Sequence, residues 1–452
     1  MKSINPSNNQ LIREYPEMSS SEINEIIDKN YSAFQQWKAF SFSARKEKML
    51  LAGEILRNRR EEFAKLITQE MGKLIAESRL EIDKCAWACE YYAFNAESIL
   101  ADEELESDAQ KSKAIFQPIG PVLAIMPWNF PFWQVFRFAA PTIMAGNSAL
   151  LKHASNVQGC ALAIESVFEE AGFPDNLVSV LVISSSAIEP VIANDKVRAV
   201  TLTGSDSAGR KVASFAGKYL KKSVLELGGS DPFIVCADAD ISETAKKAAA
   251  SRMICSGQSC ISAKRFIVMK EGAKEFVSLM EASMEAYTPG NPFDETTTLA
   301  SLARADLAEE LDKQVKESIR LGADLVIGGN PLKIEGNYYA PTILTNVTPE
   351  MPVYYQETFG PVAAVITVNS EAEAVIHANN SQFGLGASVW TKDSERGKKI
   401  AMEIESGGVF INGIVKSDPR LPFGGIKNSG YGRELSTYGI KEFVNIKTIW
   451  IK

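Results

Sequence analysis

The sequence predicts an α/β protein whose central feature is a mostly parallel sheet with helices on both faces. From residue 120 onward, short apolar segments typical of buried strands alternate with helical segments. The expected strands cover residues 122–127, 148–154, 177–183, 199–204 and 223–229, and the expected helices include 157–171 and 208–219. Such alternation places a ligand site at the carboxyl ends of the strands.

Length and composition exclude several classes of function. A chain of 452 residues, 45% of them apolar, can form two or three domains with large cores. The net charge of −8 argues against nucleic acid as a partner. Prolines, an asparagine and an arginine within the apolar stretch 120–146 argue against a membrane span. Residues 1–10 lack a secretory signal pattern, so a cytoplasmic location is expected.

Histidine and cysteine usage narrows the chemistry further. The chain has only two histidines, His153 and His377, which excludes a histidine-rich metal site, and no metal is expected. Six cysteines show no repeated spacing. Cys85 and Cys89 lie four residues apart in a helical pattern and are expected to be core residues rather than ligands.

The first hundred residues are predicted to be helical. Ser19 and Glu22 form a capping-box pattern at the start of the first helix, and amphipathic runs follow at about 43–71 and 77–100. Residues 102–113 are acidic and then polar, which indicates either a hairpin arm or an exposed linker.

Cys260, at the end of the segment Gly-Gln-Ser-Cys, is the candidate nucleophile. Gly257 and the small polar residues beside it allow the backbone to come close to a reacting carbon. A free cysteine is more often a small buried core residue, so the local sequence alone leaves that alternative open. With so few histidines, the base that takes the thiol proton is expected to be another residue.

Two strand ends carry features of a dinucleotide site. GSDSAG at 204–209 follows a strand and opens a helix, as in sites that hold phosphate on backbone amides, although it is not the usual GxGxxG pattern. LLKHAS at 150–155 places Lys152 and Ser155 where a ribose is expected. A cation and a hydroxyl there would tolerate a 2′-phosphate, whereas a solvated strand-end lysine is the alternative.

Two further residues suit acid–base and oxyanion chemistry. Glu226 ends an apolar strand and precedes two glycines, so a partly desolvated pocket would raise its pKa and make it a general base; an ion pair or a helix cap is the alternative. Asn129 lies between prolines on a fixed turn, where its amide can point at a developing oxyanion.

Taken together, these motifs resemble those of the aldehyde dehydrogenases along essentially the whole chain. The motifs on which this resemblance rests are PWNFP around Asn129, the strand-end lysine Lys152, TGS at 203–205, ELGG at 226–229, GQSC at 257–260, ETFGP at 357–361 and PFGGIKNSGYGRE at 422–434. Within the family, the chain is most similar to bacterial succinate-semialdehyde dehydrogenases.

The resemblance implies a catalytic role for three residues. Cys260 attacks the aldehyde, and the Asn129 amide and the Cys260 backbone N–H hold the oxyanion of the thiohemiacetal. After hydride transfer to the nicotinamide, Glu226 activates the water that hydrolyses the thioester.

The resemblance also implies a coenzyme site. The implied contacts come from Trp128, Lys152, Ser155, Gly204, Ser205, Leu227 and Glu357. Relatives that prefer NAD often have glutamate at the position of Ser155, so NADP is the expected coenzyme, or both are used. His153 stands where many relatives have proline.

Substrate selection is expected to depend on two residues. Arg137 lies eight positions after Asn129, and a guanidinium there indicates a substrate with a distal carboxylate, bound bidentately. Ser417 matches a serine that helps hold this carboxylate in the similar enzymes. Some relatives carry a second arginine where this chain has Ile254, so the carboxylate site is expected to be looser. The expected reaction is oxidation of succinic semialdehyde to succinate, and glutaric or other short semialdehydes and aliphatic aldehydes stay open as alternative substrates.

The resemblance also implies the domain organisation. Residues 1–96 and 118–228 are expected to form a Rossmann-type coenzyme domain, and 229–423 an α/β catalytic domain. Residues 97–117 and 424–452 are expected to form a small β element that bridges subunits of a homodimer or homotetramer. The alternating segment 442–451 is predicted to be a strand of this element.

Three other functions compete with this interpretation. A CoA-acylating dehydrogenase often lacks the general base, and Glu226 argues against it. A cysteine amidase or thioesterase would leave the coenzyme residues unexplained. A non-catalytic relative would be expected to have lost Cys260, Glu226 or Asn129, and all three are present.

Overall fold

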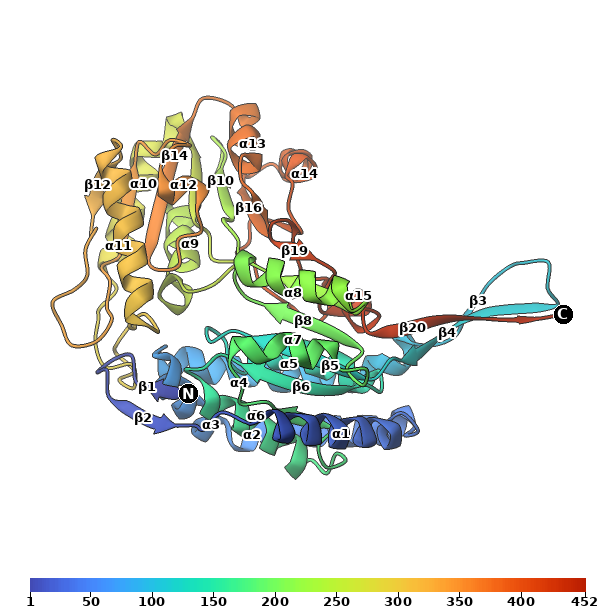
Figure 1. Cartoon of the computed structure of the whole chain (residues 1–452). Coiled ribbons are helices and arrows are strands. Elements are labelled where there is room, and N and C mark those ends of the chain that lie inside the picture. Colours follow the sequence, from blue (N-terminus) through green and yellow to red (C-terminus); the bar gives the residue numbers. More distant parts are fainter.

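The computed structural model describes residues 1–452 and has two large sheets, each covered by helices, with an arm that projects from the body (Figure 1). The fold is therefore the predicted α/β class, with strands and helices alternating from residue 118 onward. Buried apolar side chains form separate clusters around the two sheets. No helix is both long enough and apolar enough to cross a membrane.

An N-terminal hairpin and four helices precede the first sheet. They are β1 (Lys2–Ile4), β2 (Leu11–Glu14), α1 (Ser20–Trp37), α2 (Phe42–Asn58), α3 (Arg60–Met71) and α4 (Ile75–Ile99). The predicted capping box of Ser19 and Glu22 is confirmed. The prediction that this region is entirely helical is wrong for residues 1–14. The expected helix 43–71 is two helices, because the backbone leaves helical geometry at Arg59, whose side chain pairs with Glu62 and Glu170.

The first sheet contains the strands that the sequence predicts. Its order is β19-β9-β8-β5-β6-β7, and only β19 is antiparallel. The strands are β5 (Pro121–Met126), β6 (Ser148–His153), β7 (Val178–Val180), β8 (Ala199–Thr203), β9 (Lys222–Glu226) and β19 (Gly430–Tyr431). The helices beside them are α5 (Trp133–Met144), α6 (Gln158–Glu170), α7 (Ile188–Ala193) and α8 (Asp206–Lys218).

The register of this sheet aligns the strand ends that matter for the site. Met126 of β5 lies beside His153 of β6, and Thr203 of β8 lies beside Glu226 of β9. Since β5 and β8 are also parallel neighbours, all four residues lie at the same edge of the sheet.

The second sheet follows in sequence and has the order β12-β13-β14-β11-β10-β16-β17. Its strands are β10 (Pro232–Val235), β11 (Arg265–Met269), β12 (Asp324–Ile327), β13 (Thr342–Thr345), β14 (Val362–Val368), β16 (Gly386–Trp390) and β17 (Gly408–Ile411). Its helices are α9 (Ile241–Met253), α10 (Lys270–Glu285), α11 (Ala305–Arg320), α12 (Pro352–Tyr355), α13 (Glu371–Asn379) and α14 (Ser394–Glu403). The connection from α9 to β11 carries Cys260 towards the first sheet.

The remaining strands form the arm and a small pair. The arm has the order β20-β4-β3, with β3 (Glu103–Glu104), β4 (Lys111–Pro118) and β20 (Val444–Ile451) all antiparallel. A hairpin is thus present where the sequence left a hairpin or a linker open, and the predicted C-terminal strand is confirmed. β15 (Phe383–Gly384) pairs with β18 (Ile426–Lys427), and α15 (Ser436–Ile440) precedes β20. The arm extends away from both sheets with the C-terminus at its tip (Figure 1).

Candidate active site

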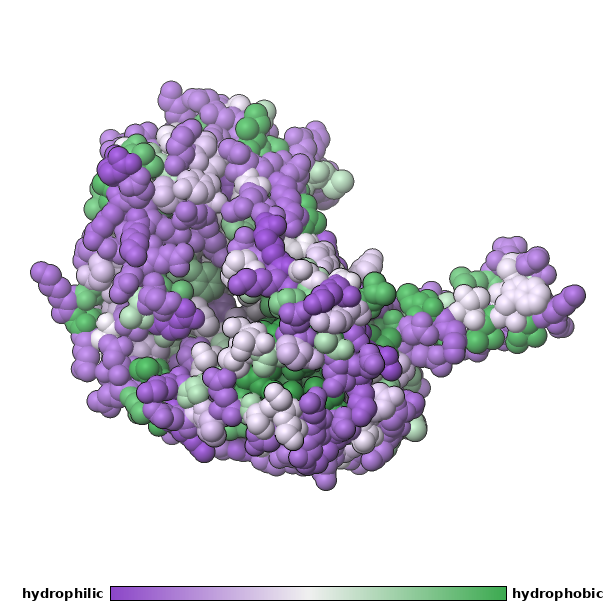
Figure 2. All heavy atoms as spheres, viewed as in Figure 1, coloured by the Kyte–Doolittle hydropathy of each residue, from purple (hydrophilic) through white to green (hydrophobic).

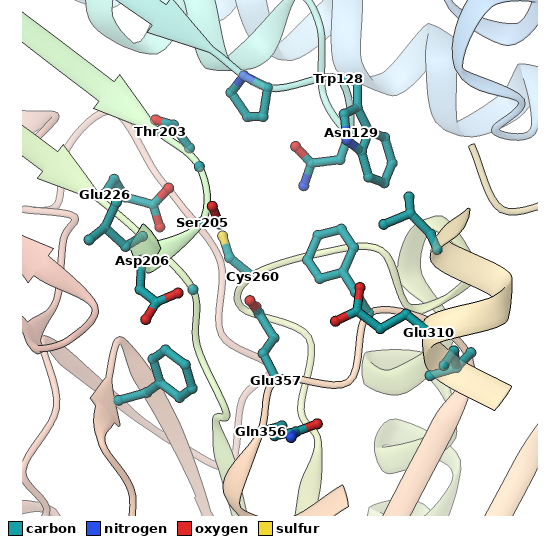
Figure 3. Close-up of a pocket in the computed structure, with 18 of the residues that line it drawn as sticks. Trp128, Asn129, Thr203, Ser205, Asp206, Glu226, Cys260, Glu310, Gln356 and Glu357 are labelled. Carbon is teal, nitrogen blue, oxygen red and sulfur yellow. The ribbon is translucent and has the colours of Figure 1, made fainter. Parts of the chain in front are cut away.

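A cavity of about 530 Å³ lies between the strand ends of the first sheet and the loops of the second. The predicted site residues that line it are Trp128, Asn129, Gly204, Ser205, Glu226, Leu227, Cys260 and Glu357. Residues from α11 and the loops beside it close the far wall. Figure 3 shows Glu226 on one side of Cys260 and Asn129 on the other, with Glu357 below, so that the side chains converge on one space.

The loop that carries Cys260 has an unusual backbone. Cys255, Ser256 and Gly257 have φ values of 53°, 52° and 80°, so three consecutive residues adopt the left-handed conformation. A Cβ on Gly257 would lie 2.1 Å from the Gly360 carbonyl oxygen, so glycine is required here. Gly257 therefore permits a close approach of this loop to the Gly360 carbonyl.

Hydrogen bonds hold this loop in place. The Cys255 N–H donates to Glu77 Oε1 at 2.7 Å. The Lys264 ammonium donates to the carbonyls of Ser259, Cys260 and Ser262 at 3.1, 2.8 and 3.2 Å. The nucleophile thus sits on a backbone that is fixed from both sides.

Cys260 is the only cysteine that is not fully buried, which separates it from the core cysteines. Burial raises the pKa of its thiol well above the ordinary value, and the nearby Glu226 charge raises it further, while Arg137 and Lys264 oppose this shift. The thiol is consequently protonated at neutral pH, and a base must remove its proton before it can attack a carbonyl. Cys255 is buried and its sulfur lies 4.0 Å from Met71 Sδ, as expected for a packing residue.

Glu226 has the properties of that base. Its carboxyl is buried at the end of β9, and burial raises its pKa to about 7, partly offset by the Arg137 charge. The Cys260 thiol is close enough to lower this pKa by hydrogen bonding. A carboxyl with a pKa near neutrality can both accept and release a proton at physiological pH. The predicted rise in pKa is confirmed in direction.

Two N–H donors are available for an oxyanion beside Cys260. Asn129 Nδ2 donates one hydrogen to the Gln258 carbonyl at 3.0 Å, and Gln134 Nε2 donates to Asn129 Oδ1 at 3.3 Å, so the amide orientation is fixed. The second hydrogen of Asn129 Nδ2 has no partner in the protein, and the Cys260 backbone N–H also donates to no protein group. Fixed donors of this kind stabilise negative charge on a carbonyl oxygen.

The coenzyme side of the cavity is built largely from backbone. Ser205 is the N-cap of α8, and its hydroxyl accepts from the Ala208 N–H. The other backbone N–H groups of the first turn have no partner within the helix, and this turn lies in the cavity wall. Glu357 Oε1 accepts from the Gly229 N–H at 3.0 Å, and a Cβ on Gly228 would lie 2.5 Å from Glu357 Oε2. Glycine at 228 therefore permits the approach of the Glu357 carboxylate. This arrangement fits a dinucleotide.

Lys152 and Ser155 lie outside the residues that line the cavity, at the carboxyl end of β6. Lys152 is half-buried and forms no ion pair, and burial lowers the pKa of its ammonium. Ser155 is exposed in the turn that follows. Glu17, from the segment before α1, is close enough to raise the pKa of Lys152, a neighbour that sequence reasoning missed. A cation without a fixed partner and an exposed hydroxyl can accept a phosphate.

Arg137 differs from the expectation of a free bidentate anchor. Its Nη2 donates to Thr203 Oγ1 at 3.1 Å and to Glu226 Oε2 at 3.2 Å, and its Nε lies 2.6 Å from Glu434 Oε2. Only Nη1 makes no contact of this kind. Arg137 and Ser417 do not line the cavity, and Arg137 has one nitrogen rather than a pair left for a further partner. The arginine is buried and close enough to Cys260 for their charges to interact.

Ser417, the other predicted substrate residue, is buried on the same side as Arg137. Its Oγ accepts hydrogen bonds from Lys84 Nζ at 2.8 Å and from Trp133 Nε1 at 3.0 Å. With both lone pairs used, its hydroxyl hydrogen is left to donate. Lys84 was not predicted from the sequence, because α4 carries no catalytic motif, and Trp133 was given no role although it precedes Arg137 on α5.

His153 is structural. Its Nε2 lies 2.9 Å from the Pro131 carbonyl, and the Ala154 N–H donates to its Nδ1 at 2.9 Å, so the ring ties the end of β6 to the turn that carries Asn129. Burial lowers the pKa of His153 to about 4, which keeps the ring neutral. Histidine at this position therefore adds one hydrogen bond to the turn, through Nε2, and one to the following residue, through Nδ1.

Comparison with known proteins agrees with this geometry. Residues 1–449 match the model of the aldehyde dehydrogenase family. A probable succinate-semialdehyde dehydrogenase (NADP(+)) from a Synechocystis species is 49% identical over 99% of both chains. A succinate semialdehyde dehydrogenase (NAD(P)+) from Escherichia coli is 44% identical, over 99% of this chain and 97% of the relative. Among solved structures, succinic semialdehyde dehydrogenase from Streptococcus pyogenes in complex with NADP+ superposes with a TM-score of 0.98 at 38% identity, covering 100% of this chain and 99% of that one.

Proposed function

Because the chain belongs to the aldehyde dehydrogenase family, we propose that it oxidises succinic semialdehyde to succinate and prefers NADP as coenzyme. The observation that supports this substrate is the buried Arg137 guanidinium, which contacts Glu226 at 3.2 Å beside the cavity and keeps Nη1 free of the partners that hold Nε and Nη2. A positive charge at that depth favours an aldehyde whose other end is a carboxylate. The relatives named above act on this aldehyde by their names, which supports the proposal.

The first chemical step is nucleophilic addition. The Glu226 carboxylate accepts the Cys260 thiol proton, directly or through a water, and the thiolate sulfur bonds to the aldehyde carbon. The aldehyde oxygen becomes an oxyanion, which Asn129 Nδ2 and the Cys260 N–H hold by hydrogen bonds. Because both donors are already fixed, little reorganisation opposes this step.

The second half of the reaction is hydrolysis. Trp128, Gly204, Ser205, Leu227 and Glu357 would hold the coenzyme. The bound coenzyme supplies the hydride acceptor that converts the thiohemiacetal to a thioester. After Glu226 has released the thiol proton to solvent, its carboxylate takes a proton from water, whose oxygen adds to the thioester carbon, and the Cys260 sulfur leaves and regains a proton as the acid is released. The neutral-range pKa of Glu226 suits both proton transfers.

The preference for NADP rests on the end of β6. Lys152 without an ion-pair partner and the exposed Ser155 hydroxyl offer a 2′-phosphate two favourable contacts, whereas a glutamate at 155 would repel it. The names of the Synechocystis relative and of the complex from Streptococcus pyogenes include NADP, in agreement with this reading.

Initial rates of reduced-coenzyme formation test both parts of the proposal. Succinic semialdehyde, glutaric semialdehyde and butanal are compared at matched concentrations, each with NADP and with NAD. The proposal predicts the highest kcat/KM for succinic semialdehyde with NADP. Equal or better turnover of butanal would discard the substrate, and a higher kcat/KM with NAD would discard the coenzyme preference. Release of a CoA thioester when CoA is added would instead indicate acyl transfer.

The assembly and location belong to the same proposal. The projecting arm exposes Ile446, Trp450 and Ile451, and β20 is an edge strand, so this arm suits pairing with a second copy of the chain in a dimer or tetramer (Figure 2). Gel filtration that gives a monomer at working concentration would contradict this. Six free cysteines and a dinucleotide coenzyme agree with a cytoplasmic location.

The domain division stays part of the proposal. The expected coenzyme domain contains the first sheet, and the expected catalytic domain contains the second. Within the tail expected in the bridging element, β19 instead pairs with β9 of the first sheet, while β20 pairs with β4 of the arm.

A further inference from the structure

Lys84 is a cation with no counter-ion on the aldehyde side of the site. It lies on α4, is half-buried, and forms no ion pair. The carboxylates near it are engaged elsewhere: Glu81 pairs with Lys73 at 2.6 Å, and Asp418 pairs with Arg420 at 2.7 Å. Removing a charge from water without a partner is costly, so a site of this kind favours an incoming anion.

The surroundings of Lys84 are shaped for such an anion. Its Nζ donates to Ser417 Oγ at 2.8 Å and lies 4.2 Å from the centre of the Trp133 ring. Trp133 and Arg137 are four residues apart on α5 and so lie on the same face of that helix. Donor hydrogens without a protein acceptor remain on three groups here: the Lys84 ammonium, which uses one of its three hydrogens on Ser417, the Ser417 hydroxyl and Arg137 Nη1.

The two cations also influence each other. Burial lowers the pKa of Lys84 to about 8, and the like charge of Arg137 lowers it further, while Cys85, Glu81 and Asp418 oppose the shift. An anion bound between Lys84 and Arg137 would attract both cations and so offset their mutual repulsion. Without a bound anion, Lys84 is a charged ammonium below a pH of about 8 and can bind a carboxylate. Above that pH its side chain is increasingly the neutral amine.

We propose that Lys84 is a substrate-binding residue whose ammonium, with Arg137 Nη1 and the Ser417 hydroxyl, holds the distal carboxylate of a short semialdehyde. This inference rests on the proposed function and deepens it. Since Ile254 occupies the position where some relatives carry a second arginine, Lys84 supplies the second positive charge from a different element.

The test compares Lys84→Met with Lys46→Met. Both lysines lie 4.2 Å from an aromatic ring centre, Trp133 for Lys84 and Phe94 for Lys46, so the control removes a similar contact far from the cavity. The readout is the ratio of kcat/KM for succinic semialdehyde to that for butanal, which lacks the carboxylate. We expect Lys84→Met to lower this ratio by about 10- to 100-fold, as for loss of a charged hydrogen bond, and Lys46→Met to leave it unchanged.

Two further measurements separate binding from misfolding. Lys84→Arg restores the charge and should recover most of the ratio. In the wild-type protein, the KM for the semialdehyde should rise as the pH passes about 8, and in Lys84→Arg this rise should move to higher pH because arginine stays protonated. A ratio that is unchanged in Lys84→Met, or lowered equally in Lys46→Met, would overturn the inference.

Inhibition by succinate distinguishes this inference from the proposed function. Succinate should compete in the oxidation of butanal by the wild-type protein, and Lys84→Met should weaken this inhibition by at least tenfold. If the wild-type protein shows no preference for succinic semialdehyde but Lys84→Met still weakens succinate binding, the proposed substrate fails and the anion site stands. If the preference exists and survives in Lys84→Met, the inference alone fails.

Discussion

The two sides of Cys260 are built in different ways. The coenzyme side consists of strand ends, glycines and the first turn of α8, so it is largely a backbone surface. The aldehyde side consists of side chains from α4, α5 and the loop at Ser417, where Lys84 has no counter-ion and Arg137 is paired with Glu226 and Glu434. The first side offers a dinucleotide mainly backbone, whereas the second would, on the proposed function, select the aldehyde by charge.

Because the two sides are built differently, the residues proposed for catalysis and those proposed for selection of coenzyme and aldehyde lie in different places. Cys260, Glu226 and Asn129 lie where the two sides meet, and Arg137 connects them because its guanidinium contacts Glu226 from the aldehyde side. A change at the junction should therefore stop the chemistry with every substrate. A change on one side should alter selection of the coenzyme or of the aldehyde only.

The largest effect is expected for Cys260→Ala at the junction. Loss of the sulfur removes covalent catalysis, and kcat should fall by about 10⁴-fold or more with every aldehyde. Cys255→Ala is the matched control, because Cys255 is a buried packing residue five positions away. The measurement is the steady-state kcat of both variants. Similar losses of kcat in the two would mean that a packing change, and not loss of the nucleophile, lowers the rate.

Glu226→Gln should lower steady-state turnover by roughly 10²- to 10⁴-fold, since the general base is lost. The wild-type kcat/KM should fall as pH drops below about 7, because the raised pKa leaves the Glu226 carboxyl protonated and unable to accept a proton. Initial rates between pH 5 and 9 check this. An acid limb that persists unchanged in Glu226→Gln would assign it to another group.

Ser155→Glu tests the coenzyme side alone. A carboxylate near the 2′-phosphate should lower kcat/KM for NADP by about 10²-fold, because like charges placed together cost several kcal/mol. The same variant with NAD is the internal control and should change far less. Equal losses with both coenzymes would place Ser155 away from the 2′-position.

Gly228→Ala should give a smaller effect on the same side. The new Cβ would lie 2.5 Å from Glu357 Oε2, so the Glu357 carboxylate must move and the KM for the coenzyme should rise about tenfold. Gly217→Ala on α8 is the matched control, because a Cβ there meets no atom within 4 Å. This control should keep its KM and gain about 0.5–1 kcal/mol in free energy of unfolding. Thermal melts and coenzyme titrations compare the two.

The same difference explains how much could be predicted from the sequence. The coenzyme side follows local rules in its secondary structure, because β8, the N-cap at Ser205 and α8 are adjacent in the chain, so the strand and the helix after it were predicted, whereas the coenzyme contacts came from the family resemblance. The first sheet was predicted for the same reason. The exceptions were the hairpin at residues 1–14 and the break at Arg59, where the backbone leaves helical geometry between α2 and α3.

The aldehyde side depends on contacts between remote parts of the chain. Lys84 and Ser417 are 333 positions apart, and no local pattern indicates that they meet. Glu434 lies in a motif that the sequence did bring out, but its pairing with Arg137 follows only from packing. The bidentate role expected of Arg137 failed for this reason, because carboxylates from two other elements occupy its Nε and Nη2.

The central claim is that Cys260 carries the acyl group of succinic semialdehyde until Glu226 activates water. Mass spectrometry of Glu226→Gln, acid-quenched after mixing with succinic semialdehyde and NADP, tests this claim most directly. Because Glu226 also accepts the Cys260 thiol proton, acylation is slowed in this variant as well, so the quench follows a long incubation. We then predict a succinyl group on the peptide that contains Cys260, together with one equivalent of NADPH per site. NADPH formation with an unmodified Cys260, or a succinyl group on a different cysteine, would contradict the account.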